Sequence, residues 1–145
     1  MYFVDREKIE TILKFLELKF SLFEEIKEWD TMVGKAALER SCHIMIEAIL
    51  DVGNAMIDGF IMRDPGSYDD IIDILEDEKV INEELSKSYK EIIKYRKMLV
   101  QMYTEIDHSE VHSTFTEQLP LLKQFPEKIR TYLLNELGPV SAFRN

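Results

Sequence analysis

An arginine, a glutamine and a tyrosine stand close together late in the chain, at Arg96, Gln101 and Tyr103. A guanidinium can hold a phosphate through two parallel hydrogen bonds, and a tyrosine hydroxyl can donate or accept one. A glutamine amide also forms hydrogen bonds, but it cannot exchange a proton near neutral pH. These residue types can form hydrogen bonds with an anion.

The neighbours of Arg96 at helical spacing are largely apolar. They are Tyr89, Ile92, Ile93, Leu99, Val100 and Tyr103. Burying an unpaired guanidinium is unfavourable, so Arg96 must either pair with a carboxylate or lie in a cleft. The polar side of the preceding long helical segment offers Glu47 and Asp51 as supporting carboxylates.

The segment that contains Arg96 is basic within an acidic protein. The whole chain has a formal net charge of −10 at pH 7, which argues against non-specific binding to nucleic acid or anionic lipid. Residues 86–103 nevertheless hold five Lys and Arg against one acid, Glu91. A polyanion such as RNA would dock there first, with Lys94 and Lys97 beside Arg96. The alternative interpretation is a solvated lysine face.

Hydrophobic periodicity predicts an all-α protein. Helices are expected over about 5–29, 33–62, 68–77 and 83–103. A last helical region, capped by Asp107 or Ser109, contains Pro120 and Pro126, so we expect it to be kinked or broken. The pattern predicts an up-and-down bundle of four to six helices, as a single domain over residues 1–138 with a C-terminal tail at 139–145.

Several kinds of site find little support in the sequence. No run of about 18 apolar residues occurs, so no membrane span is expected. Cys42 is the only cysteine, which favours a reducing, cytoplasmic setting, and it stands between apolar helix positions as a small hydrophobe. His43, His108 and His112 do not combine into a strong metal-ligand pattern, so neither a metal nor a cofactor is expected.

The segment from Lys94 to Tyr103, followed by Glu105-Ile106-Asp107, resembles the signature segment of HepT-like proteins. These form a branch of the HEPN superfamily and are often encoded beside a small nucleotidyltransferase. Their motif is Arg, four residues, His, one residue, Tyr. Residues 36–52 and 67–81 are similar to the family's second helix and to its third helix with the following turn. The resemblance covers roughly residues 1–125.

The resemblance implies a homodimer of HEPN-like bundles in which both copies of the motif line one cleft. Active members are described as metal-independent endoribonucleases that act as toxins on RNA, often tRNA. A partner nucleotidyltransferase serves as antitoxin by adenylylating the motif tyrosine. Arg96 matches the motif arginine and Tyr103 the tyrosine, which makes Tyr103 the candidate for AMPylation. Gln101 stands at the histidine position.

Helical geometry adds a constraint on this motif. On one regular helix Arg96 and Tyr103, seven residues apart, would share a face, whereas Gln101 would be turned about 140° away from Arg96. Gln101 can therefore converge with Arg96 only if the helix ends there or if a second subunit brings in its own copy. The spacing also favours a homodimer.

Three hypotheses remain open at this point. The first is an active ribonuclease toxin in which His43 or His108 supplies the proton transfer, or in which Arg96 acts slowly alone. The second is a nuclease-inactive dimer that binds RNA, a nucleotide or a nucleotidyltransferase. The third is a structural interaction bundle in which Arg96 is simply paired with Glu47 or Asp51. Whether Arg96 is open or enclosed discriminates between the last and the others.

Overall fold

The computed structural model describes residues 2–140, in which all regular structure is helical. The helices are α1 (Arg6–Glu25), α2 (Met32–Gly59), α3 (Tyr68–Asp77), α4 (Glu83–Ile93), α5 (Arg96–Val100), α6 (His108–Leu122) and α7 (Phe125–Leu137). Most of the predicted tail, residues 141–145, lies outside the described part. None of the described helices is both long and apolar enough to cross a membrane.

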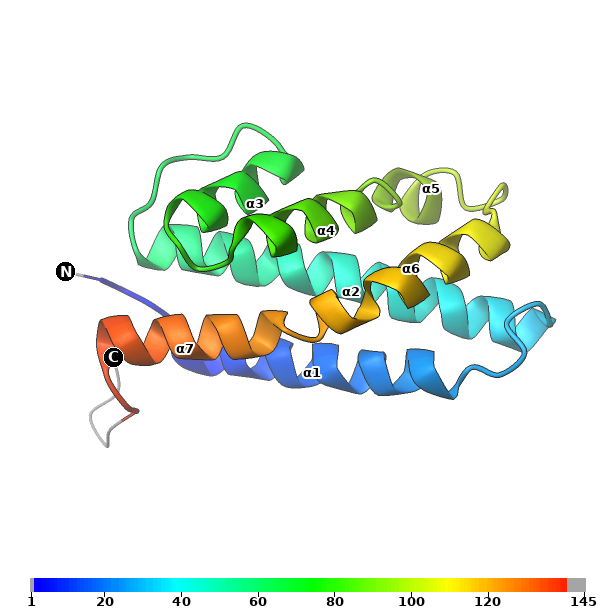
Figure 1. Ribbon diagram of the computed structural model, residues 1–145, viewed down its shortest axis with the longest axis horizontal. Coiled ribbons are helices and arrows are strands. Elements are labelled where there is room, and N and C mark those ends of the chain that lie inside the picture. The colour runs from blue at the N-terminus through cyan, green and yellow to red at the C-terminus, as the bar shows by residue number, and fades with distance from the viewer. Residues whose placement is uncertain (1, 141–145) are drawn as a thin grey trace.

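The helices run up and down along one long axis, as predicted (Figure 1). α1 and α2 form the longest antiparallel pair; α3 packs on α2, and α4 packs on α3 and α6. α4 with α5, and α6 with α7, each follow a common path with a short interruption (Figure 1). The seven helices therefore make five rods, which agrees with the expected four to six.

Side-chain caps set where several helices begin. The side chains of Thr31, Ser67, Asn82 and Asp107 each accept a hydrogen bond from the backbone N–H three residues further on. Of the two caps considered for the last helical region, Asp107 is the one used.

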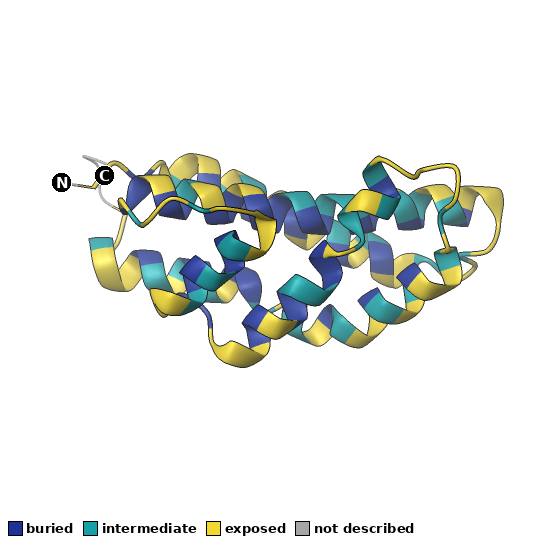
Figure 2. Ribbon diagram, turned by 90° about the horizontal axis from the view of Figure 1, so that it is seen from above, coloured by how far each residue is buried: buried dark blue, intermediate teal, exposed yellow. Residues whose placement is uncertain are grey.

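Buried residues occupy the sides of the helices that face one another (Figure 2). The Tyr89 hydroxyl crosses from α4 to donate to the Leu121 carbonyl of α6 at 2.9 Å, and the Tyr89 ring meets the Phe125 ring edge to face. Arg130 of α7 binds both Glu10 and Glu17 of α1. These contacts join the two interrupted rods to each other and hold α7 against α1.

The prediction of one helix over residues 83–103 is wrong. The helix stops at Ile93, resumes at Arg96 and ends at Val100. At the interruption the Tyr95 N–H donates to the Ile92 carbonyl at 3.1 Å, a tighter turn than an α-helix makes. The Tyr95 hydroxyl is held on α6 by Glu110 and Thr114, at 3.0 and 2.9 Å. This bridge to α6 fixes the chain where α5 begins.

Other boundaries differ less. The first two helices end at Glu25 and Gly59, a few residues earlier than the periodicity suggested. The expected break in the last helical region is confirmed between Leu122 and Phe125, where Pro126 falls in the first turn of α7. Pro120 lies inside α6 without ending it.

Candidate functional site

Arg96 is the first residue of α5, and its side chain lies against α2. Its Nε donates a hydrogen bond to Glu47 Oε1 at 2.7 Å. The guanidinium carbon lies 4.6 Å from the centre of the Tyr68 ring, at the start of α3, in a cation–π contact. The Arg96 side chain is 24% exposed. Arg96 is thus paired with a carboxylate but still reaches solvent.

The pairing leaves most of the guanidinium unused. Among residues 2–140, Glu47 is the hydrogen-bond partner of Arg96, and it engages Nε alone. The two terminal nitrogens of an arginine carry four of its five N–H donors, and a planar pair of such donors suits a phosphate. Arg96 is thus paired with Glu47, as the structural alternative expects, but it is not fully enclosed by carboxylates.

A row of polar side chains on α2 extends the site on both sides of Glu47. One turn earlier, His43 Nε2 lies 3.6 Å from the same Glu47 oxygen that Arg96 binds. One turn later, partial burial raises the pKa of the Asp51 carboxyl, and the Glu47 carboxylate raises it further, against smaller effects of Lys8 and Arg96. The site therefore combines an imidazole, two carboxylates and a guanidinium.

Glu47 and Asp51 also line an apolar groove between α1 and α2. Its volume is about 490 Å³, and its remaining lining is Thr11, Ile12, Lys14, Phe15, Leu18, Ile44 and Ala48. Phe15 and Leu18 are 42% and 64% exposed. The groove and the Arg96 site share their acidic residues, so they form one continuous surface.

Gln101 and Tyr103 lie beyond the end of α5. The Gln101 and Met102 N–H groups both donate to the Lys97 carbonyl, which closes the helix. Gln101 and Tyr103 are exposed, Tyr103 to 67%. Because the helix ends at Val100, the prediction that Arg96 and Tyr103 share a face of one regular helix is wrong. Within the described chain, neither Gln101 nor Tyr103 has a hydrogen bond or ring contact with Arg96.

The basic segment is largely neutralised by ion pairs. Lys94 Nζ lies 2.9 Å from Glu91, and Lys90 Nζ lies 2.5 Å from Asp73. Lys97 is exposed and has no ion pair with the described residues. The assignment of Lys94 and Lys97 to RNA contact stays a prediction.

Two of the three histidines have structural partners. His108 Nε2 lies 2.7 Å from Glu39 Oε2, and the His112 ring stacks between Phe23 and Trp29. Across residues 2–140, no group of three or more His, Cys, Asp or Glu is arranged to hold a metal ion. Burial raises the pKa of the Cys42 thiol, which fits its expected role as a small hydrophobe.

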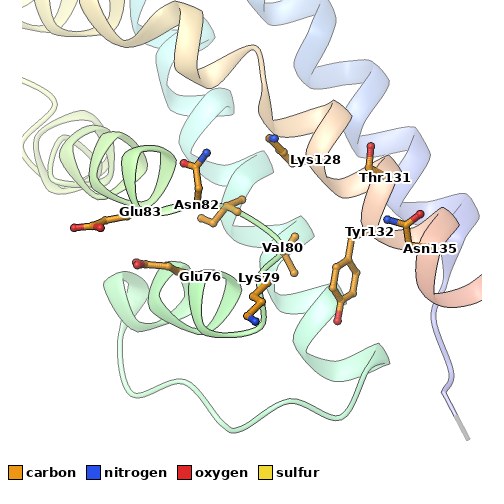
Figure 3. A pocket seen from close by; sticks show the side chains of 10 residues that line it. Glu76, Lys79, Val80, Asn82, Glu83, Lys128, Thr131, Tyr132 and Asn135 are labelled. Atoms are coloured by element: carbon orange, nitrogen blue, oxygen red, sulfur yellow. The ribbon is translucent and has the colours of Figure 1, made fainter.

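A second hollow, also of about 490 Å³, lies between the α3–α4 turn and α7 (Figure 3). Lys79 and Lys128 line it together with Glu76 and Glu83, so its charges are mixed. It contains none of the predicted site residues, and it lies toward the end of the bundle away from α5 (Figure 1).

Comparison with known proteins connects this chain to a family. A family model described as "Ribonuclease HepT-like" matches residues 6–129. YutE from Bacillus subtilis is provisionally named an RNase. It is 54% identical to this chain over 144 residues, which cover 99% of this chain and 100% of that protein. The solved structure of YutE, described as a cytosolic protein of unknown function, has a TM-score of 0.95 over 99% of this chain and 100% of that chain.

More distant solved structures share the fold. A tri-AMPylated HEPN toxin of Shewanella oneidensis, in complex with MNT antitoxin, has a TM-score of 0.76 at 17% identity, covering 85% of this chain and 96% of that one. A toxin–antitoxin structure with AMP-PNP has a TM-score of 0.79 at 16% identity, covering 87% of this chain and 99% of that one. The HEPN-like fold expected from the sequence is confirmed.

Replacing Glu47 by alanine is expected to destabilise the protein. The substitution leaves the partly desolvated Arg96 without its carboxylate, so the free energy of unfolding should fall by about 1–2 kcal/mol. Denaturant unfolding measures this, with the exposed α2 residue Asp58→Ala as the control, expected to stay within about 0.5 kcal/mol of the parent. Equal effects of the two substitutions would contradict the importance of the Arg96–Glu47 bond.

Proposed function

The chain belongs to the HepT-like ribonuclease family, and on this premise we propose that it is an RNA-cleaving toxin that holds the scissile phosphate on Arg96. The observation that carries the proposal is the one-sided pairing of Arg96: Nε binds Glu47 while the terminal nitrogens remain free to bind an anion. The substrate class is RNA, with tRNA as the first candidate, and the provisional RNase name of YutE supports it.

The chemistry requires three contributions from the site. A base removes the proton of the ribose 2′-hydroxyl, a cation stabilises the charge that develops on the phosphorane, and an acid or water protonates the leaving 5′-oxygen. Arg96 is suited to the second role, because a guanidinium keeps its charge and binds phosphate through two nitrogens. Gln101 cannot serve as acid or base, but it can hydrogen-bond RNA from its exposed position.

We further propose that a nucleotidyltransferase regulates this protein through Tyr103. The Tyr103 side chain is 67% exposed on the turn after α5, where a modifying enzyme can reach it. The AMPylated state of the Shewanella oneidensis toxin supports this proposal by analogy of fold. We place the protein in the cytosol, as YutE is described.

We propose that a second copy of the chain binds in the α1–α2 groove. The groove is apolar and exposes Phe15 and Leu18, and it continues directly into the Arg96 site through Glu47. Lys14 lies on the same surface as the two acidic residues, so two copies related by a two-fold axis can pair opposite charges across the contact. Such a homodimer would bring two Arg96 sites toward one cleft.

Incubation of the purified protein with total tRNA tests the proposed activity. The parent is expected to cut tRNA, and Arg96→Ala to slow the cut by about 10²–10³-fold, because the phosphorane loses its cation. Gln101→His, which restores the motif histidine, is expected to cut at least as fast as the parent. An unchanged rate in Arg96→Ala would contradict the assignment. Cleavage by Gln101→His alone would instead favour a disabled site that binds RNA without cutting it.

Leu18→Glu tests the dimer. A charge in the centre of the apolar contact should convert a dimeric parent into a monomer, as measured by sedimentation equilibrium. Leu134→Glu is the matched control, because Leu134 is 52% exposed on α7, outside the groove. A monomeric parent, or a Leu18→Glu variant that still dimerises, would show that the groove does not hold a second copy.

A further inference from the structure

We propose that His43 is the proton-transfer residue of this site and takes the place of the histidine that is absent at position 101. The assignment rests on the proposed RNA-cleaving function. Its structural basis is one shared atom: Glu47 Oε1 accepts from Arg96 Nε at 2.7 Å and lies 3.6 Å from His43 Nε2. A phosphate bound to the terminal nitrogens of Arg96 would therefore lie beside the His43 imidazole.

The surroundings of the other two histidines single out His43. His112 is stacked between two aromatic rings, and His108 is only 16% exposed and bound to Glu39. His43 is 32% exposed, and its contact with Glu47, at 3.6 Å, is longer than a hydrogen bond. Its ring nitrogens thus remain available to a substrate at the surface.

The charged groups around His43 suit a base that becomes an imidazolium. Glu47 on its own helix faces it, and Arg96 approaches the same carboxylate from α5. Glu39, one turn earlier on α2, is occupied by His108 of α6. An imidazole can take a proton at its unprotonated ring nitrogen and return it to solvent. Glu47 holds Arg96 by a hydrogen bond and lies next to His43.

The proposed step balances as follows. An unprotonated His43 nitrogen takes the proton of a ribose 2′-hydroxyl, and the 2′-oxygen forms a bond to the adjacent phosphorus. The bond from phosphorus to the 5′-oxygen breaks with its electron pair, and the 5′-oxygen takes a proton from water. The products are a 2′,3′-cyclic phosphate and a 5′-hydroxyl, and the imidazolium returns its proton to solvent.

Single-turnover cleavage of tRNA over a range of pH tests the assignment with His43→Gln. This variant should fold like the parent, because His43 is partly exposed, and thermal unfolding checks that it does. It is expected to cleave about 10²–10⁴-fold more slowly at unchanged tRNA affinity. The parent rate should rise with pH as the base loses its proton, and the variant should lack that limb.

His108→Gln is the matched control, because a glutamine amide can still donate to Glu39. It is expected to cleave at the rate of the parent and to keep the pH limb. A His43→Gln variant with the rate and pH profile of the parent overturns the role of His43 and leaves the nuclease proposal standing. A parent protein that cuts no tRNA overturns both. Products with a 5′-phosphate would overturn the proposed step even if His43 proves essential.

Discussion

The hydrogen bond from Arg96 to Glu47 is the interaction on which the geometry of the site depends. It pairs the Arg96 guanidinium with a carboxylate. The Arg96 side chain is only 24% exposed, and an unpaired charge at such a position would be strongly unfavourable. It also fixes the first turn of α5 against α2. Because it uses Nε, the remaining donors of Arg96 keep their capacity for a phosphate. His43 Nε2 lies 3.6 Å from the same carboxylate oxygen, so a cation and an imidazole lie close to one atom.

The helices of the fold can be predicted from local patterns in the sequence. The 3.6-residue apolar period and polar caps such as Asn82 and Asp107 are local features, so they identify the helices without knowledge of tertiary contacts. The interruption at residues 94–95 could not be predicted in this way. No Gly or Pro stands at these positions. The residues that hold the Tyr95 hydroxyl, Glu110 and Thr114, lie on a helix further along the chain. The end of α5 at Val100, which lies between them, separates Arg96 from Tyr103.

The site could also be predicted in part from patterns in the sequence. Glu47 was expected beside Arg96 because an arginine among apolar neighbours needs a carboxylate and the polar side of the preceding long helix offered one, and the structure brings the two together. His43 was named only as one of two alternative proton-transfer groups. Its spacing of i, i+4 from Glu47 was visible in the sequence, but Arg96 reaches that oxygen only through tertiary packing. The local charge count included Glu91, which pairs with Lys94, but it left out Asp73 and Glu47, which reach Lys90 and Arg96 from other helices.

The most direct measurement of the central claim is a crystal structure with a short RNA whose 2′-hydroxyl at the cut site is replaced by hydrogen, which blocks cleavage. The account predicts a phosphate oxygen within hydrogen-bond distance of the terminal nitrogens of Arg96, with Nε still on Glu47 and the His43 ring facing the sugar. RNA bound at another surface, or Arg96 turned so that its terminal nitrogens are occupied by Glu47 and Asp51, would contradict it.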